Sequence, residues 1–453
     1  MSNNIRFIAR ITLEAKTGLF VGSGESSLLK DALVQRDHLG LPMIQGTSLA
    51  GVLRHSLEEA SPNPIWDSIF GFQKGDKGNG SRLKISSAYL ISENDEIIES
   101  LDCKIPDHIT KHFENLPSRQ HVRISDKGVA EKNGLFDNEV VYAGCKFKFE
   151  IELIGTEVDK NAWNNILNQM YQPNFRLGSG TRNGYGKLAV EKIETKTFDL
   201  TQKSDFESYL AFDPSLNTKL EGFETDFNSK QNISLVNYRL ELKPDLFFMF
   251  SEGSGDDQVD NKPTTEEKMV YNADKTISFV NHTLVPGSSI KGAIRHRVAF
   301  HYNKLLKRWA DPGNDRDGKN NEAVFALFGI ESKGETGQRG NIMIDDIYFN
   351  ESEVNNDKIF NHVAIDRFTG GAMDGALFSE KVSQLIENDI VFEINLSLNK
   401  SEFNDENINH AFEAALIDIC KGLLPLGGMT TKGNGMFTGK LFKNETEIYN
   451  YGA

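Results

Sequence analysis

The sequence predicts an α+β protein that contains one domain twice. Four segments of the first half recur in the same order in the second half. Each half opens with alternating apolar residues, as a half-buried strand does, and later helical patterns separate further alternating runs. The order strand–helix–strand–strand–helix–strand is that of a ferredoxin-like domain, so we expect two such domains in tandem.

The predicted elements follow the same order in both halves. The first strand is IRFIARITLEA (5–15) in one half and SLVNYRLELKP (234–244) in the other. The first helix continues from a Gly-Thr/Ser-Ser sequence whose serine, Ser48 or Ser289, is a good N-cap. The later strands, second helices and last strands are predicted at 146–153, 161–171 and 187–194 in the first half and at 389–396, 408–424 and 436–443 in the second.

The internal repeat sets the domain boundaries. The matched pairs are 43–55 with 284–296, 65–72 with 323–330, 121–136 with 362–378, and 177–188 with 426–437. The displacement is 241 residues for the first and third pairs, 258 for the second and 249 for the fourth, as duplication followed by changes in loop length would produce. The stretch after Asp199 is polar and lacks periodicity. We therefore expect domain one at 1–200, a linker at 201–234 and domain two at 235–447.

The composition restricts the class of protein. Hydrophobic residues make up 38% and charged residues 25%. The sequence contains no run of roughly 18 apolar residues, so no membrane helix is predicted. The N-terminus reads as a strand and lacks the apolar core of a signal peptide. Three cysteines without a CxxC pair argue against a disulfide framework and a zinc knuckle, and predict a cytoplasmic protein. A net charge of −15 argues against indiscriminate binding to nucleic acid but leaves room for a local basic groove.

The start of each first helix could hold a phosphate. A Gly-Thr/Ser-Ser start presents free backbone amides at the positive end of the helix dipole. Arg54 lies farther along the first of these helices, and Lys291 and Arg295 lie along the second. The alternative interpretation is a capped surface helix with ordinary basic residues.

The second candidate is a glycine-rich loop. LGSGTRNGYG (177–186) and LGGMTTKGNG (426–435) let a ligand approach the backbone closely, and they contain Arg182 and Lys432. Each loop follows a helix and precedes a strand, the reverse of a dinucleotide fingerprint, so nicotinamide binding is rejected. A tight turn without a ligand is the alternative.

The third repeated pair is a long excursion that is rich in glycine and charge. It could reach across a bound strand, or it could be only a mobile surface loop. Its basic residues are Arg119, His121, Arg123, Lys127 and Lys132 in the first copy and His362 and Arg367 in the second.

A polar loop between the first strand and the first helix contains Asp31, Asp37 and His38. A carboxylate beside a phosphate site can position or deprotonate a ribose 2′-hydroxyl, or hold a divalent ion. A lone aspartate in such a loop is otherwise only solvated. The sequence has no evident Ser-His-Asp order or HExxH zinc motif.

Together these pieces resemble the RAMP superfamily of CRISPR systems, and above all the backbone subunits of type III effector complexes. The resembling motifs are GLFVGSG, LKDALVQRD, IQGTSLAGVLRH with VPGSSIKGAIRH, AIDRFTGGAMDGALF and the two glycine loops, which together span nearly the whole chain. The resemblance implies two modified ferredoxin-like, RRM-like domains that contact a guide CRISPR RNA. It also implies a thumb-like hairpin between guide and target, and an aspartate that cleaves the target RNA with a divalent ion such as Mg²⁺.

Under this resemblance Asp31 is the catalytic and metal-binding residue, and the thumbs fall at about 119–140 and 362–380. The residues expected to contact RNA are Ser48, Arg54, Arg119, His121, Arg123, Arg182, Ser289, Lys291, Arg295, His362, Arg367 and Lys432. Counting back from the second copy's helix, the position of Asp31 corresponds to Glu267. The loop before it is longer and contains Asp256, Asp257 and Asp260. The second copy therefore either cuts with a substituted carboxylate or does not cut.

The sequence thus predicts a subunit that binds guide RNA and cleaves complementary target RNA as an endoribonuclease, in a complex with other subunits. Two alternatives stay open. One is a non-catalytic scaffold that binds the guide. The other is a CRISPR RNA-processing endoribonuclease of the same superfamily, which would use a histidine base such as His38 or His55.

Overall fold

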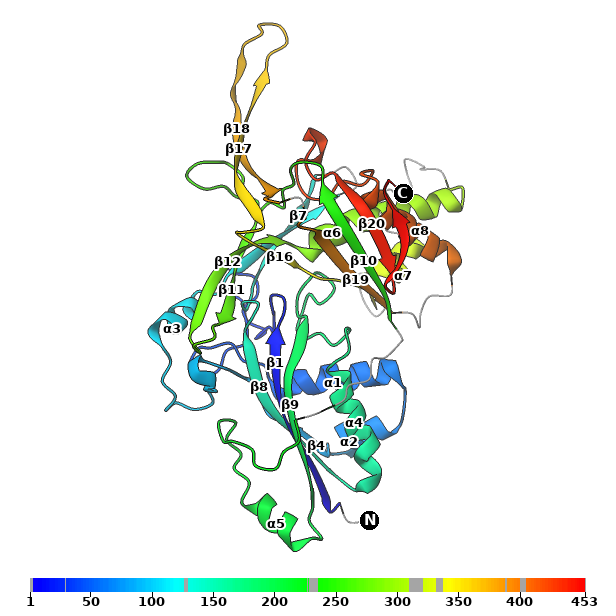
Figure 1. Cartoon of the computed structure of the whole chain (residues 1–453). Coiled ribbons are helices and arrows are strands. Elements are labelled where there is room, and N and C mark those ends of the chain that lie inside the picture. The colour runs from blue at the N-terminus through cyan, green and yellow to red at the C-terminus, as the bar shows by residue number, and fades with distance from the viewer. Residues whose placement is uncertain are drawn as a thin grey trace.

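The computed structural model describes residues 3–28, 30–125, 129–225, 227, 235–308, 321–330, 337–387, 389–399 and 405–452. Within these residues each half of the chain forms an antiparallel sheet with helices packed on one face (Figure 1). The mixture of helices and strands is the α+β class that the sequence predicts. None of the helices described is long and apolar enough to cross a membrane.

The sheet of domain one has the strand order β4–β8–β1–β9, with β5 also paired to β8. Its strands are β1 (Ile5–Ala15), β4 (Leu83–Ile85), β5 (Tyr89–Leu90), β8 (Lys146–Gly155) and β9 (Leu188–Asp199). Alternate residues of β8 are buried because one face of the sheet packs against helices. The other elements are α1 (Gly46–Ala60), α2 (Ile65–Phe70), β2 (Phe72–Lys74), β3 (Lys77–Asn79), α3 (Asp107–Glu114), β6 (Ser118–Ile124), β7 (Ala130–Glu139), α4 (Lys160–Gln169) and α5 (Lys203–Leu210).

Domain two repeats this arrangement, with the strand order β15–β19–β10–β20–β21. Its sheet contains β10 (Leu235–Pro244), β15 (Ile342–Ile344), β19 (Phe392–Asn399), β20 (Phe437–Lys443) and β21 (Thr446–Asn450). The other elements are β11 (Thr265–Tyr271), β12 (Ile277–Val285), α6 (Gly287–Leu305), α7 (Glu322–Phe328), β13 (Gly329–Ile330), β14 (Gln338–Arg339), β16 (Ile347–Asn350), β17 (Val354–Ile365), β18 (Ala372–Leu385) and α8 (Glu406–Cys420). The hairpin β17–β18 projects from the rest of the molecule (Figure 1).

The first part of the expected linker is folded, so the boundary at residue 200 is wrong. Residues up to 225 form α5 and a segment that packs back on the sheet of domain one. The buried Arg10 on β1 explains this packing, because its guanidinium donates to the carbonyls of Asp213 and Thr218 at 2.7 and 3.0 Å. A buried guanidinium is costly without such acceptors. Residues 226 and 228–234 of the expected linker lie outside the described residues.

A buried ion cluster joins the two domains. Arg119, at the base of the β6–β7 hairpin, donates to both carboxylate oxygens of Glu266 at 2.5 and 2.8 Å and to Asp346 at 2.5 Å. All three residues are buried. Burial by itself would lower the pKa of Arg119, but the carboxylates of Asp346 and Glu266 raise it well above its usual value. The hydroxyl of Tyr348 also contacts the Arg119 guanidinium and accepts from the amide of Gly18.

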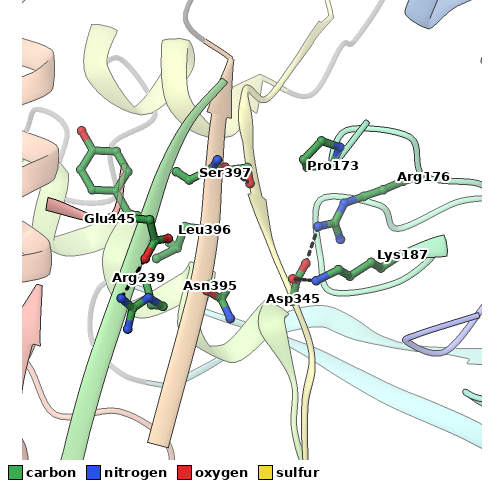
Figure 2. Close-up of a pocket in the computed structure, with 11 residues that line it drawn as sticks. Pro173, Arg176, Lys187, Arg239, Asp345, Asn395, Leu396, Ser397 and Glu445 are labelled. Carbon is green, nitrogen blue, oxygen red and sulfur yellow. Dashed lines mark hydrogen bonds and ion pairs between the residues drawn. The ribbon is translucent and has the colours of Figure 1, made fainter. Parts of the chain in front are cut away.

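A second set of ion pairs lies along the same junction. Arg176 and Lys187, on the two stems of the first glycine loop, both bond the carboxylate of Asp345 in domain two. Figure 2 shows the two basic side chains extending from domain one toward Asp345. They form one wall of a pocket of about 310 Å³ whose other wall includes β10 and β19. These basic residues therefore hold the domains together.

The β11–β12 hairpin of domain two packs on domain one. Met269 and Ile277 belong to the apolar core of domain one, and Phe279 stacks on the ring of His112 with a centroid separation of 3.8 Å. The hydroxyl of Tyr271 donates to the carbonyl of Ile91 at 2.7 Å. The interface thus combines apolar contact with the buried ion cluster.

Replacing Arg119 with methionine should destabilise the chain strongly. The substitution leaves the carboxylates of Glu266 and Asp346 buried without their cation, and breaking such a pair costs about 3–5 kcal/mol. The measurement is the free energy of unfolding in urea, followed by tryptophan fluorescence. Lys275→Met is the matched control, because Lys275 also pairs across the interface, with Asp95, but both side chains are exposed. Exposed pairs contribute little, so equal losses in the two variants would contradict the role of burial.

Candidate functional site

The polar loops after the first strands of the two domains have the same backbone structure. The amide of Gln35 donates to the carbonyl of Val21, and that of Thr264 to Phe250, each at 2.7 Å. A second bond, from Ser23 to Leu33, recurs between the residues 229 positions later. Every residue from Val21 to Gln35 therefore corresponds to the residue 229 positions farther along the chain.

This register pairs Asp31 with Asp260. The amide of Asp31 donates to Oδ1 of Asp137 at 2.7 Å, and the amide of Asp137 donates to Oδ2 of Asp31 at 3.1 Å. In domain two, Oδ2 of Asp260 accepts from the amide of Ser379 at 2.7 Å and from its hydroxyl at 3.1 Å. Asp137 and Ser379 occupy the same position of the two long hairpins, directly after the phenylalanine that pairs with the first histidine of each hairpin. Each domain thus places one aspartate at the base of its hairpin.

The correspondence of Glu267 with Asp31 is therefore wrong. Glu267 lies on β11 opposite Asn281, and its carboxylate is 3.9 Å from His112 of domain one. Counting back from the helix fails because the segment from Gln35 to Met43 in the first copy is twelve residues shorter than its counterpart from Thr264 to Leu284. Counting forward from the first strand of each half gives Asp260. The correct counterpart of Asp31 could therefore have been found from the sequence.

The ion pairs that lie next to Asp31 and Asp260 differ between the two domains. Beside Asp31, the buried Glu139 of β7 accepts from Lys30 and Arg36, each at 3.0 Å. Burial alone would raise the pKa of Glu139, but the amide of Val34 and the ammonium of Lys30 lower it below its usual value. Beside Asp260 the polarity is reversed: Lys381, the counterpart of Glu139, bonds Asp256 at 2.7 Å and lowers the pKa of that carboxyl to about 2.

The carboxylate of Asp31 is open to a ligand. Asp31 is exposed and lines a pocket of about 330 Å³ formed by Phe20, Gly22, Gly24, Glu25, Ser26, Ala32 and Leu33. Across the described residues, no three His, Cys, Asp or Glu side chains gather closely enough to hold a metal ion. Mg²⁺ is often held by one or two carboxylates together with substrate phosphates. Asp31 beside Asp137 fits that limited role.

A basic cluster lies where the first glycine loop meets helix α6. Burial, together with Arg339 and Arg176, lowers the pKa of Arg182 to about 9. Burial, together with Arg182 and Arg295, lowers the pKa of Lys291 to about 8. Lys291 bonds Oδ1 of Asn183 in domain one at 3.0 Å, so the cluster spans the junction. Mutual repulsion among desolvated cations favours an anionic ligand at this place.

The residues of the two first helices that were predicted to contact RNA differ in their surroundings. Ser48 and Ser289 lie inside the first turn and are not N-caps, because the helices begin earlier, after Gln45 and Pro286. Arg54 bonds Glu58 and Asp67 and thereby links α1 to α2.

The hairpin residues also divide into different roles. Arg119 is excluded as an RNA contact because it is buried in the ion cluster between the domains. His121 bonds the hydroxyl of Tyr185 at 2.6 Å, and burial with the nearby Arg119 lowers its pKa to about 4, so it is neutral at pH 7. His362 instead bonds the buried Glu380 at 2.9 Å.

The other basic residues of the hairpins and the second glycine loop lie at the surface. Arg123 and Arg367 are exposed on the two hairpins. Lys432 lies 4.0 Å above the ring of Phe378. Lys127 lies outside the described residues.

The sequence matches the RAMP superfamily over residues 12–189 and 272–438. It is 29% identical over 195 residues to the CRISPR system Cms endoribonuclease Csm3 of Methanocaldococcus jannaschii, which covers 40% of this chain and 77% of that protein. It is 28% identical over 209 residues to the protein of the same name from Streptococcus thermophilus, covering 43% and 90%. A chain in the type III-B Cmr-beta cryo-EM structure of the apo state is 18% identical, and the match covers 41% of this chain and 96% of that chain with a TM-score of 0.32.

Alanine at Gly184 should destabilise the chain much more than alanine at Gly433, the same position of the second glycine loop. Both residues have positive φ, 106° and 94°, so both variants carry the left-handed penalty of about 1–2 kcal/mol. A β-carbon at Gly184 would also lie 1.8 Å from Oδ1 of Asp346, whereas none of the described atoms lies within 4 Å of one at Gly433. The measurement is the thermal unfolding midpoint. Equal shifts would show that Gly184 does not contact domain two closely.

Proposed function

The chain belongs to the RAMP superfamily, and on that premise we propose that it is a backbone subunit of a type III CRISPR effector complex, which binds guide RNA and cleaves complementary target RNA. The observation that carries the proposal is the pair of aspartates, Asp31 and Asp260, in the same place at the bases of two long hairpins. The names of the similar endoribonucleases support the same activity. The strand order of the two sheets supports two modified ferredoxin-like, RRM-like domains.

Guide RNA is proposed to bind at the basic cluster. Arg182, Lys291 and Arg295 come from the glycine loop of one domain and the first helix of the other. A phosphate there would relieve the repulsion that lowers the pKa of Lys291. Such contacts hold the RNA backbone without reading its sequence, which base pairing with the target supplies. The net charge of −15 fits a subunit in which one local surface binds RNA and other surfaces contact the other subunits of the complex, in the cytoplasm.

Cleavage is proposed to occur at the base of each hairpin. The 2′-oxygen of the target RNA would attack the adjacent phosphorus and form a 2′,3′-cyclic phosphate. The bond from that phosphorus to the 5′-oxygen of the next nucleotide would break, and this oxygen would leave as a hydroxyl after taking a proton from water. The exposed carboxylate of Asp31 can orient the 2′-hydroxyl and accept its proton. A divalent ion such as Mg²⁺, held by Asp31 and RNA phosphate oxygens, would stabilise the negative charge that develops.

The second centre is proposed to use Asp260. Its carboxylate is fixed by Ser379 in the way that Asp31 is fixed by Asp137. Glu267 faces α3 of domain one and is too far along β11 to share this position. A non-catalytic scaffold is the alternative that the cleavage experiment decides.

Asp31→Ala and Asp260→Ala should each remove one cut site in a complementary RNA. The assembled complex is incubated with guide RNA, end-labelled target and magnesium, and the fragments are resolved on a gel. Losing the base should reduce cutting at its site by about 10²–10⁴-fold.

Target binding should be unchanged in both variants, and Glu267→Ala should cut like the wild type. Unchanged cutting at every site in both aspartate variants would contradict the assignment of Asp31 and Asp260 as catalytic residues. Cutting of precursor guide RNA instead would favour a processing endoribonuclease with a histidine base.

Affinity for guide RNA should fall as the pH rises from 7 to 9. Lys291, with a pKa of about 8, is largely charged at pH 7 and loses its proton across this range, so its attraction to phosphate weakens. Lys291→Met should flatten the pH dependence and reduce the slope of log affinity against log salt by about 1. Fluorescence anisotropy with labelled RNA measures both. Lys84→Met, which removes an exposed lysine paired with Glu152, should retain the pH dependence.

A further inference from the structure

Arg176, on a stem of the first glycine loop, is buried while two of its guanidinium nitrogens are unsatisfied. Its side chain is only 3% exposed, and Nη2 donates to the carboxylate of Asp345. Neither Nε nor Nη1 has a hydrogen-bond partner among the residues that the structure describes. A buried donor without an acceptor costs free energy, so these two nitrogens call for an explanation.

The other buried arginines are fully satisfied. Within the described part of the chain these are Arg10 and Arg119. Every guanidinium nitrogen of Arg10 donates to an acceptor within 3.0 Å, and every one of Arg119 donates to an acceptor within 2.8 Å. The fold therefore supplies acceptors to buried guanidinium groups elsewhere, and Arg176 is the exception.

Arg176 lines the pocket of about 310 Å³ between the two domains. Figure 2 shows Asn395 and Ser397 of β19 between Arg176 at one end and Arg239 of β10 at the other. The volume lies at the lower end of the range of about 300–1,000 Å³ that is typical of small-molecule sites. The pocket therefore has room for a small organic molecule.

The end of the pocket at Arg176 has an excess of positive charge. Arg176 and Lys187 share one carboxylate, that of Asp345, which accepts from Nζ of Lys187 at 2.6 Å. Burial alone would raise the pKa of Asp345, but the two cations lower it, so the carboxyl is ionised at pH 7. At the other end Arg239 already pairs with Glu445 at 3.0 Å. An anionic group is thus favoured beside Arg176.

The middle of the pocket is polar but uncharged. Its side chains there are those of Asn237, Asn395 and Ser397. Amides and hydroxyls bond neutral polar groups, and they do not supply the charge that a second anionic group needs. The part of the ligand that extends from Arg176 along β19 is therefore neutral and polar.

The pocket opens on the face of the domain-two sheet that is turned away from α6. Ile394 and Leu396 of β19 belong to the apolar core that includes α6. Because side chains alternate along a strand, Asn395 and Ser397 lie on the opposite face. The start of α6, where guide RNA is proposed to bind, is on the other side of the sheet.

We propose that this pocket binds a small polar molecule through a phosphate or carboxylate group whose oxygens accept from Nε and Nη1 of Arg176. Hydrogen bonds to a charged acceptor are stronger than neutral ones, so the ligand would satisfy both nitrogens and neutralise the excess charge. The inference does not depend on RNA binding or RNA cleavage.

Isothermal titration calorimetry of the full chain without RNA tests the site. Inorganic phosphate and acetate are titrated separately against a chloride background of equal ionic strength, and the anion that binds distinguishes a phosphate from a carboxylate ligand. Arg176→Lys keeps the positive charge beside Asp345 but removes the guanidinium donors, so it should weaken binding by about tenfold or more. Asn395→Asp adds a negative charge to the pocket and should weaken binding to a similar extent.

Asn281→Asp is the matched control and should bind like the wild type. Like Asn395, Asn281 is exposed on a strand and lies beside a glutamate, Glu267, but it does not line the pocket. Circular dichroism checks that the variants are folded, and Asn395→Asp alone decides if Arg176→Lys is not. Saturating guide RNA should leave the affinity unchanged.

Three results would overturn the inference. The first is that neither anion binds. The second is an affinity that a folded Arg176→Lys or Asn395→Asp variant leaves unchanged. The third is competition between the anion and guide RNA, which would assign the unsatisfied nitrogens of Arg176 to RNA instead.

Discussion

The guanidinium of Arg119, buried between Glu266 and Asp346, is the interaction on which the rest of the molecule depends. It joins the hairpin of domain one to the β11–β12 hairpin and to the start of α6, since Asp346 also accepts from the amide of Gly287 at 2.8 Å. The positions of the first glycine loop and of α6 are thereby fixed relative to each other. That relation brings Arg182 and Lys291 together in one basic cluster.

Local patterns were sufficient to predict much of this fold. The alternation in KFKFEIEL is that of β8, whose every second residue is buried. The repeated segments that begin at His121 and His362, for which the resemblance to the RAMP superfamily implies thumb-like hairpins, lie in the hairpins β6–β7 and β17–β18. Partners distant in sequence were not predictable. Arg119 resembles an exposed hairpin arginine until its partners, 147 and 227 residues away, are known. Arg10 likewise determines the path of a segment more than 200 residues later.

The candidate site, too, could be predicted from the sequence only in part. Asp31 could be proposed from its motif, because the loop around it is short and polar. Its counterpart could not be found by counting back from the helix, since the β11–β12 hairpin lengthens that part of the second copy. The two aspartates keep one geometry although the ion pairs beside them have opposite polarity, Glu139 with Lys30 in one domain and Lys381 with Asp256 in the other. Backbone register, rather than the nearby charges, defines the site.

The covalent link between the domains has a thermodynamic consequence. An interface with several buried charges forms poorly between separate chains, because the desolvation of the ions offsets most of their attraction. In a single polypeptide the two surfaces meet at an effective concentration that can reach the order of millimolar, so an interface of modest intrinsic affinity stays closed. Duplication within one gene product would thus permit a charged junction inside the chain.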